Sequence, residues 1–391
     1  MSGIVRIDGV VRDYAWGRPG GISAARGQEP GERPEAELWL GSHRAAPSRV
    51  LTDRPGDPPW PDLGAWEDAT GDTLPFLMKL LAAAAPLSLQ AHPGPEQARA
   101  GFEREEAAGV PRDAPARSFR DPHAKPEVLL AVEDGFDALC GFRPVEEVVA
   151  LLDTLAELTD EPALPAWRAR LADPEAGLRE AVAWLLSGDP AVDRLVEALA
   201  RTPPTGLPER DADLVRLLTG HHPGDPGIAV ALMLNRVTLA AGEALWLPAG
   251  NIHAYLSGLG VEVMGPSDNV LRGGLTGKHV DVAELLEVLD FTPGPPPRLA
   301  PVDVAPAVRT YRPSTQETGA AVPWQLLEVT GPADVAAGSP SVALVLEGEF
   351  TLRAEGHDGL TLARGEAGFV ERAGRLQVQG SGALYLATTV S

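Results

Sequence analysis

The sequence predicts a mainly β chain of 391 residues that carries a helical insertion. Three observations predict this fold class. Residues 1–143 and 225–292 consist of short apolar runs broken by glycine and proline, which is typical of strands joined by turns. Residues 144–224 repeat apolar side chains at helical spacing. Residues 293–391 return to short strand-like runs after a proline-rich linker. We therefore expect two β-barrel domains, the first of them interrupted by a helical domain.

The charge limits the expected partners, and the cysteine content indicates the cellular compartment. The formal net charge is −22, so neither nucleic acid nor an anionic membrane is an expected partner. The chain has one cysteine, Cys140, which excludes an internal disulfide and fits a reducing cytoplasm. We find no secretory signal and no long apolar run, so we expect a cytoplasmic protein that does not cross a membrane.

Some aromatic and histidine side chains are expected to have no role in chemistry. We expect packing roles for four of them near the N-terminus: Tyr14, Trp16, Trp39 and His43. His221 and His222 follow the helical region in a loop rich in proline and glycine, and we expect both at the surface.

The run LPFLMKLLAAAAPLSLQAHP places polar groups within an apolar segment. Lys79 interrupts its first half. In an extended strand Ser88, Gln90 and His92 share one face, because side chains repeat every second residue. Buried polar groups need partners, and one metal ion would satisfy Gln90 and His92 together. The alternative is a polar strand edge that faces solvent.

The segment DPHAKPEVLLAVED supplies a further candidate ligand. Pro126 disfavours a helix at Lys125, so a strand is expected to begin at Glu127. Lys125 and Glu127 then share a face. A carboxylate at the start of an apolar strand is costly unless it is paired or bound to a metal, which makes Glu127 a candidate ligand.

The densest group of polar residues lies between Gly242 and Asp281. Its opening has the spacing G-x5-P-x-G-x2-H and ends at His253. Proline fixes φ and glycine permits a tight reversal, after which a strand presents His253 to the interior. This spacing resembles the second signature of cupin barrels, in which the histidine points to a metal. The alternative is a core histidine with an ordinary hydrogen-bond partner.

The same segment continues as a predicted strand followed by a helix. Alternation over residues 259–264 places Val261 and Val263 on one face and Glu262 on the other. We expect Glu262 to point either to solvent or into the mouth of a barrel. The run DVAELLEVLDF predicts a helix with Asp281 as its N-cap.

The C-terminal strands repeat the spacing of glycine and apolar residues that precedes His253. When Gly365 is aligned with Gly242, the histidine position falls on Leu376, and a shift of one residue gives Gln377. Neither side chain is a histidine. We therefore expect the second barrel to lack metal ligands.

Two imidazoles, one carboxylate and one amide form a candidate ligand set: Gln90, His92, Glu127 and His253. Imidazole with few oxygen ligands suits zinc. Only one ligand is anionic, so bound Zn²⁺ would keep positive charge and act as a Lewis acid. Two histidines and a carboxylate also suit non-haem iron, so iron chemistry stays open.

Six ordered blocks resemble type I mannose-6-phosphate isomerases of the cupin superfamily: YAWG, LPFLMKLL, PLSLQAHP, HAKPE, PAGNIHAYLSG and VEVMGPSDNVLRGGLTGKHVD. The resemblance runs from Tyr14 to Asp281. It implies a bicupin, with two jelly-roll-like barrels and a helical domain. It also implies one zinc ion per chain, held by the four candidate ligands, and a catalytic Arg272. One departure is Gly277, where the family usually has proline before the lysine, which loosens the loop that carries Lys278.

The resemblance implies interconversion of D-mannose 6-phosphate and D-fructose 6-phosphate. A proton moves between C2 and C1 through a cis-enediol, whose developing charge needs zinc or Arg272. The base and the proton shuttle are drawn from four candidates: Glu262, Lys125, Tyr255 and Asp268. We place Glu262 first, because burial on an apolar strand would raise the pKa of its carboxyl group. The expected phosphate contacts are Ser88, Arg272 and Lys278, with Lys79 nearby.

Two other functions are weighed against this isomerase. One is another metal-dependent cupin enzyme of the iron dioxygenase type, and the other is a non-enzymatic bicupin that binds sugar phosphate. The glutamine ligand and the block SDNVLRGGLTGKHVD argue against the dioxygenase, while the intact ligand set argues against the binding protein. For the isomerase we expect a role in mannose metabolism and a monomer or weak homodimer.

Overall fold

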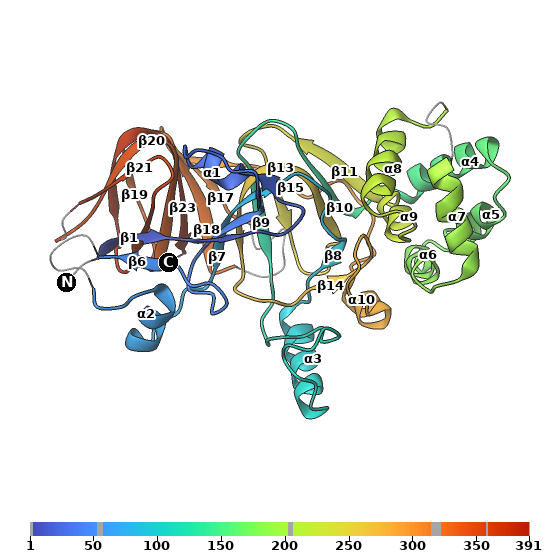
Figure 1. Ribbon diagram of the computed structural model, residues 1–391, viewed down its shortest axis with the longest axis horizontal. Helices are drawn as coiled ribbons and strands as arrows, with labels where there is room; N and C mark the ends of the chain where they lie inside the picture. The colour runs from blue at the N-terminus through green and yellow to red at the C-terminus, as the bar shows by residue number, and fades with distance from the viewer. Residues whose placement is uncertain (1–2, 53–57, 202–205, 314–321, 357–358, 391) are drawn as a thin grey trace.

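The structure is a computed structural model, and it describes residues 3–52, 58–201, 206–313, 322–356 and 359–390. Figure 1 shows helices at one end of the molecule, the C-terminal strands at the other and a further sheet between them. The prediction of a mainly β chain with a helical insertion is confirmed. No helix among the described residues is both long and apolar enough to span a membrane.

The central antiparallel sheet runs in the order β15-β12-β9-β13-β7-β5-β2, with β8 and β10 on β13, β11 on β10 and β14 on β8. The bounds of its strands are β2 Val10–Arg12, β5 Glu37–Leu40, β7 Leu77–Ala83, β8 Gln90–Ala91, β9 Glu127–Ala131, β10 Phe136–Phe142, β11 Leu234–Leu239, β12 Ala244–Leu247, β13 His253–Met264, β14 Leu271–Arg272 and β15 Arg298–Leu299. A separate ribbon pairs β3 (Arg18–Pro19) with β4 (Pro34–Glu35).

The second sheet joins the two ends of the chain. Its order is β16-β17-β18-β23-β20-β22-β1-β6, with β19 on β23 and β21 on β20. Its C-terminal strands are β16 Val302–Ala305, β17 Val308–Tyr311, β18 Trp324–Val329, β19 Ala333–Val335, β20 Ser341–Ala354, β21 Leu360–Ala363, β22 Ala367–Val370 and β23 Leu376–Thr389. The N-terminal strands β1 (Ile4–Asp8) and β6 (Arg49–Leu51) also lie here, and β1 pairs with β22 (Figure 1).

Five described helices of the insertion pack at the end of the molecule beyond β10 and β11 (Figure 1): α4 Val145–Leu158, α5 Ala163–Arg170, α6 Gly177–Leu185, α7 Pro190–Arg201 and α8 Glu209–His221. The short helix α9 (Gly227–Ala231) follows them, in a run that the sequence predicts to be strand, so that prediction is wrong there. The apolar faces of these helices share one core with Leu89, Ala91 and residues of β10 and β13. The remaining helices are α1 Gly21–Ala25, α2 Leu63–Thr70, α3 Pro95–Ala107 and α10 Val282–Val288. Asp281 caps α10, as predicted, and accepts a hydrogen bond from the backbone of Glu284.

The turn before β13 has the conformation that the sequence predicts. Gly250 has φ 81°, and a Cβ atom there would lie 2.9 Å from the carbonyl oxygen of Val288. Only glycine adopts this conformation without strain. The chain then enters β13 at His253, which pairs with Gln90 of β8 and Cys140 of β10.

The two faces of β13 have different roles. Val261 and Val263 pack into the core shared by the two sheets. Glu262 lies on the opposite face and is 3% exposed. Along the backbone, Glu262 is the partner of Lys79 on β7 and of Leu129 on β9. The alternation predicted from the sequence is thus realised, with Glu262 directed to an interior pocket.

Candidate active site

A cavity of about 790 Å³ opens at the central sheet and receives side chains from β5, β7, β13, several loops and the end of α8. Every candidate catalytic and phosphate-binding residue lines it: Lys79, Ser88, Lys125, Tyr255, Glu262, Asp268, Arg272 and Lys278. Gln90 and Glu127 also line it, while His92 and His253 lie buried beside it with 1% of their surface exposed. The fold therefore gathers residues that are up to 199 positions apart, from Lys79 to Lys278, around one cavity.

Three of the four candidate ligands form a compact group. The Nε2 atom of His92 lies 3.4 Å from Oε1 of Glu127, and the Nε2 atom of His253 lies 3.2 Å from Oε2. One potential ligand atom from each of the three side chains lies within 4.8 Å of the others. Each side chain is almost completely buried.

These ligand atoms lie close to one another but form no hydrogen bonds with one another. Among the described residues, His92 Nε2, His253 Nε2 and Glu127 Oε2 are buried polar atoms that have no hydrogen-bond partner of acceptable geometry. Their separations are those of ion pairs, but their orientations do not form hydrogen bonds. Buried polar atoms are normally hydrogen bonded unless another group satisfies them. Atoms that converge on a common point in this way fit a metal ion.

The outer nitrogen of each imidazole is fixed by a backbone carbonyl group. His92 Nδ1 lies 2.7 Å from the carbonyl oxygen of Asn269, and His253 Nδ1 lies 3.0 Å from that of Asn251. A proton on each Nδ1 leaves the Nε2 lone pair free for a metal. Burial, together with the positive charge of Lys125, lowers the pKa of His92 to about 4. His92 is therefore neutral at physiological pH, which is the form that binds metal.

Glu127 is held as a carboxylate despite its burial. Burial alone would raise its pKa, but the opposing effects, of which the positive charge of Lys125 is the largest, lower it well below the ordinary value. The ammonium group of Lys125 lies 3.0 Å from Oε1 of Glu127. The group thus offers one anionic and two neutral ligands, the donor set that the sequence predicts for zinc.

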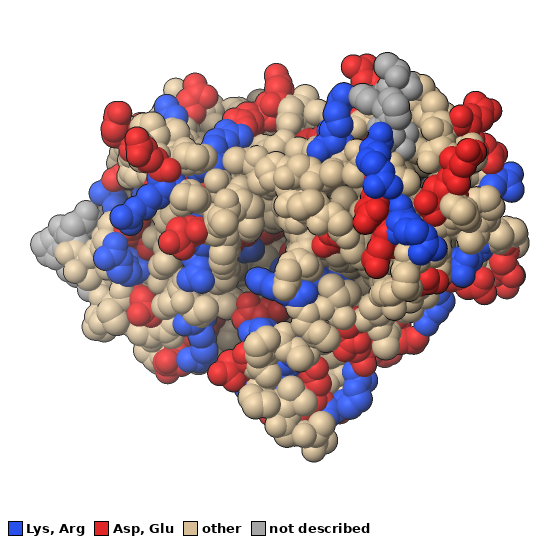
Figure 2. All heavy atoms as spheres, turned by 45° about the vertical axis from the view of Figure 1, so that its right-hand side comes forward, with Lys and Arg blue, Asp and Glu red and all other residues tan. Residues whose placement is uncertain are grey.

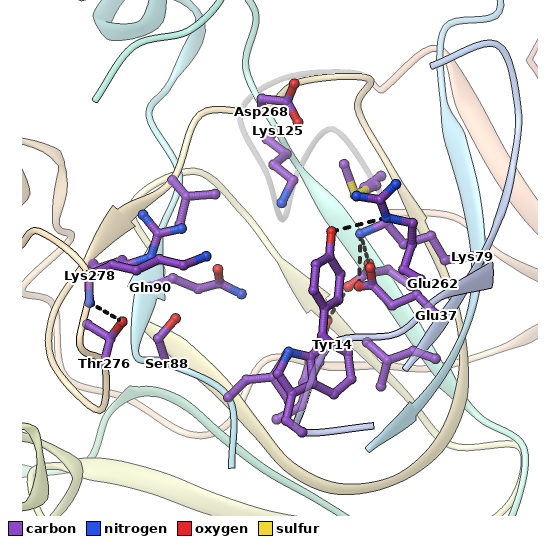
Figure 3. Close-up of a pocket in the computed structure, with 18 of the residues that line it drawn as sticks. Tyr14, Glu37, Lys79, Ser88, Gln90, Lys125, Glu262, Asp268, Thr276 and Lys278 are labelled. Carbon is purple, nitrogen blue, oxygen red and sulfur yellow. Dashed lines mark hydrogen bonds and ion pairs between the residues drawn. The ribbon is translucent and has the colours of Figure 1, made fainter. Parts of the chain in front are cut away.

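Gln90 lies next to this group. Its backbone pairs with His253 on one side and with Arg272 on the other. Figure 3 shows the Gln90 side chain reaching into the cavity from the same side as Ser88 and Lys278. Leu89 and Ala91 point the other way, into the core of the helical region, so the predicted alternation around Gln90 is present.

Comparison with known proteins identifies the family. Residues 4–145 match the family described as phosphomannose isomerase type I, catalytic domain. Mannose-6-phosphate isomerase of Escherichia coli (strain K12) is 34% identical over 371 residues, which cover 92% of this chain and 93% of that protein. The chain belongs to the type I mannose-6-phosphate isomerase family. The Bos taurus enzyme of the same name is 34% identical over 389 residues, covering 88% of this chain and 87% of its own.

Solved structures of phosphomannose isomerases share the whole fold. A mutant of the Salmonella typhimurium enzyme matches with a TM-score of 0.85 and 29% identity, and the match covers 100% of both chains. A zinc-bound mannose 6-phosphate isomerase matches with a TM-score of 0.81 and 29% identity, over 100% of both chains. Family membership favours the isomerase over the dioxygenase and the binding protein that the sequence left open.

In this member of the type I mannose-6-phosphate isomerase family, cations gather on one side of the cavity. Burial and then the neighbouring Arg272 and Arg120 lower the pKa of Lys278. Burial and then Arg120 lower the pKa of Arg272. The charges that act on Lys278 are thus other cations, although the chain as a whole has a net charge of −22. Figure 2 shows acidic and basic side chains interspersed over one face of the molecule. A region of unneutralised positive charge suits an anionic ligand.

The other side of the cavity carries a buried network of acids and bases. The ammonium group of Lys79 lies 3.1 Å from Oε2 of Glu262 and 3.3 Å from Oε1 of Glu37. The hydroxyl group of Tyr255 donates to Oε1 of Glu262 over 2.7 Å. Figure 3 shows Lys79, Glu37 and Glu262 together, across the cavity from Lys278. Burial raises the pKa of Glu262, as expected from its place on an apolar strand, and Lys79 opposes that effect.

Asp268 lies at the cavity beside His43. The Nε2 atom of His43 is 3.3 Å from Oδ1 of Asp268, and this contact lowers the pKa of Asp268. The ring of His43 also packs against Trp39 in an edge-on arrangement, with 4.9 Å between the ring centroids. His43 therefore packs against Trp39, as expected, and also lines the cavity.

The sequence analysis missed several residues that line the cavity: Tyr14, Glu37, Arg120, His221 and His222. Glu37 gave the same signal as Glu127, a carboxylate at the start of an apolar strand, and the sequence alone could have identified it. No local sequence pattern predicts Arg120 at the cavity, because its position depends on a loop that folds back toward Arg272. His221, at the end of α8, is exposed as expected, whereas His222 is only partly exposed and its Nε2 atom lies 3.4 Å from the carbonyl oxygen of Pro86.

Proposed function

We propose that this chain interconverts D-mannose 6-phosphate and D-fructose 6-phosphate, the activity named for its relatives. One observation carries the proposal. The buried group of His92, Glu127 and His253, whose inward atoms lack hydrogen-bond partners among the described residues, lies beside a cavity that has cations on one side and an acid–base network on the other. This arrangement matches a reaction that must bind a phosphate and move a proton.

We assign one Zn²⁺ ion to Gln90, His92, Glu127 and His253. The supporting facts are the unpartnered atoms of three of these residues and the position of Gln90 beside His253. A relative of the same fold is described as zinc-bound. When bound, zinc supplies positive charge that stabilises oxyanions of the substrate.

We assign the substrate phosphate to Ser88, Arg272 and Lys278. All three line the same side of the cavity, and Arg120 adds a further positive charge there. A phosphate dianion would relieve the repulsion among these cations and accept charge-assisted hydrogen bonds from them. Lys79, included in the sequence analysis as a nearby phosphate contact, is assigned to the opposite side because two carboxylates hold its ammonium group.

We assign proton transfer between C2 and C1 to Glu262. Its buried carboxylate has a raised pKa and lies within hydrogen-bond distance of Lys79 and Tyr255, which can keep it oriented. A base works best when its pKa is near the operating pH. Arg272 would stabilise the enediolate that forms, while Lys125 and Asp268 are the candidates for moving the hydroxyl proton.

The finer architecture is part of the same proposal. We propose two cupin barrels, with the catalytic one built from residues 1–143 and 225–292, a helical domain over 144–224 and a second barrel without metal ligands over 293–391. The antiparallel sheets and the helices α4 to α8 support this division. The strands β1 and β6 nevertheless complete the C-terminal sheet, so the N-terminal segment contributes to both barrels. A cytoplasmic monomer or weak homodimer is the corresponding expectation.

The proposed function is tested by mixing purified protein with mannose 6-phosphate in deuterium oxide. We expect fructose 6-phosphate to form, with deuterium incorporated at the carbon that receives the proton, because an enediol route exchanges with solvent. Unphosphorylated mannose serves as the control and should react far more slowly. Loaded protein that converts neither sugar phosphate into the other would refute the proposal.

A further inference from the structure

Glu37 is a buried carboxylate that the proposed reaction does not yet use. Its side chain is 8% exposed, and it shares the ammonium group of Lys79 with Glu262. One lysine therefore faces two carboxylates inside the protein. Burying a second carboxylate against one cation costs free energy, so its presence calls for a compensating contact or a functional reason.

The position of Glu37 is fixed from two directions. Its Oε1 atom accepts from Lys79 over 3.3 Å, while its Oε2 atom accepts from the indole nitrogen of Trp39 over 2.8 Å. Trp39 in turn lies beside Lys79, whose ammonium group is 5.3 Å from the indole ring centroid. Backbone pairing joins Trp39 to Lys79 and Lys79 to Glu262, so three adjacent strands, β5, β7 and β13, hold the network.

We propose that Glu37 is a positioning residue that holds the Lys79 ammonium group beside Glu262 and opposes the ionisation of Glu262 through its own negative charge. The inference rests on the proposed function, in which Glu262 receives the proton. Without Glu37, Lys79 would bind Glu262 alone and make it a weaker base. With Glu37, the Lys79 ammonium group is shared between two carboxylates, and Glu262 is a stronger base than it would be with the lysine to itself.

The charges around Glu262 fix the direction of the effect. Five groups face it from the surrounding elements: Lys79 on β7, Glu37 on β5, Glu127 on β9, Lys125 just before β9 and Tyr255 on β13. Glu37 and Glu127 oppose ionisation of Glu262, while the two lysines favour it. Removing the charge of Glu37 therefore lowers the pH at which Glu262 loses its proton.

The test is the pH profile of kcat for Glu37→Gln. Lys79 and Trp39 donate to different oxygens of Glu37, and an amide has only one acceptor oxygen, so glutamine cannot keep both contacts in place. We expect kcat to fall by about 10- to 100-fold, because the proton-transfer group is misplaced. KM should change much less, since the phosphate side of the cavity is untouched. The acidic limb of the kcat profile should move down by about half a pH unit or more.

Two further variants separate positioning from stability. Glu35→Gln removes a carboxylate two residues away, one that accepts from the backbone and hydroxyl of Ser23 and does not line the cavity. It should affect thermal unfolding without moving the acidic limb. Glu37→Asp keeps the negative charge, so its acidic limb should stay near that of the wild type although kcat falls. Metal content is measured in each variant so that activities are compared per loaded site.

Specific results would overturn the inference. It is wrong if Glu37→Gln keeps both kcat and the acidic limb of the wild type. It is also wrong if Glu37→Gln and Glu35→Gln lose activity equally with unshifted profiles, since that result indicates a structural role alone. Failure of the proposed function would give a different result from failure of this inference, because wild-type protein would then convert neither sugar phosphate at any pH.

Discussion

The ring of His92 is held by the backbone of Asn269: its Nδ1 atom lies 2.7 Å from the carbonyl oxygen. The side chain of Asn269 forms hydrogen bonds with a neighbouring loop. Its Oδ1 atom accepts from the backbone N–H groups of Arg120 and Asp121, and its Nδ2 atom donates to the carbonyl oxygens of Asp121 and His123. One buried residue therefore joins a proposed zinc ligand to the loop that leads into Lys125 and Glu127.

We predict that Asn269→Ala weakens zinc binding by about 10- to 100-fold, the usual effect of removing a group that orients metal ligands. The loop before Glu127 would lose its anchors, and the carbonyl that orients His92 would lose its rigid surroundings. Zinc affinity is measured by competition with a chromophoric chelator.

Asn235→Ala is the matched control for Asn269→Ala. Asn235 is also a buried amide that donates to backbone carbonyl groups, those of Gly141, Phe142 and Gly294, and it does not line the cavity. We expect Asn235→Ala to lower the midpoint of thermal unfolding while zinc affinity is kept. Equal losses of zinc affinity in the two variants would contradict the specific role of Asn269.

Much of the site could be predicted from the sequence because its signals are local. Proline and glycine before His253 specify a reversal, and a strand follows. Carboxylates on apolar strands, Glu127 and Glu262, are costly to bury without a partner, so each one indicates a buried contact. Helical spacing indicated α4 to α8 in the same way, whereas α9 (Gly227–Ala231) lies in a run that was expected to form strands.

The remaining features depend on contacts between distant segments. The pairing of β1 with β22 joins residues more than 350 positions apart, as Ile4 pairs with Val370, and no local pattern encodes that choice. Arg120 lines the cavity, and the loop that carries it is held by a hydrogen bond from the Arg120 backbone N–H to the Asn269 side chain. The two sides of the cavity, with Lys79 opposite Lys278, likewise follow from the order of strands in the sheet.

We predict that substrate binding weakens as the pH rises, and that Lys278 is the cause. Burial and two neighbouring cations lower its pKa, so it loses its proton at a lower pH than an ordinary lysine, whose pKa is about 10.4. Only the protonated form attracts a phosphate. KM for mannose 6-phosphate should therefore rise on the alkaline side, while Lys278→Arg, which stays charged, should keep KM constant over the same range. An unchanged alkaline rise in Lys278→Arg would assign the effect to another group.

We predict that Gly277→Ala stabilises the loop before Lys278. Nothing lies within 4 Å of a Cβ atom at this position, and Gly277 is not among the glycines with positive φ. Replacing such a glycine removes freedom from the unfolded chain and adds about 0.4–1 kcal/mol to the free energy of unfolding. Chemical denaturation measures the change, and KM should fall if the stiffer loop holds Lys278 better.

Gly109→Ala is the control for Gly277→Ala. Gly109 also has open space around a Cβ atom, but its φ is 69°, which strains any other residue. Gly109→Ala should therefore lower the free energy of unfolding. If both variants shift the free energy of unfolding in the same direction, backbone conformation does not explain the effect at Gly277.

We predict that Cys140 is unreactive in the folded protein. Its side chain is fully buried, and burial raises its pKa to about 12. A thiol alkylating reagent at pH 8 should modify it only as fast as the protein unfolds, and rapidly in denaturant. Above the ordinary thiol pKa of about 8.5, the unfolded state ionises while the folded state does not, so this group's stabilising contribution declines as the pH rises. Rapid modification of native protein would contradict the burial of Cys140.

The most direct test is a zinc titration of metal-free protein followed by the conversion of mannose 6-phosphate to fructose 6-phosphate. We predict that activity rises in proportion to bound zinc and saturates at one ion per chain, and that His253→Ala neither binds that ion tightly nor turns over substrate. Full activity in metal-free protein, or in His253→Ala without zinc, would contradict the account.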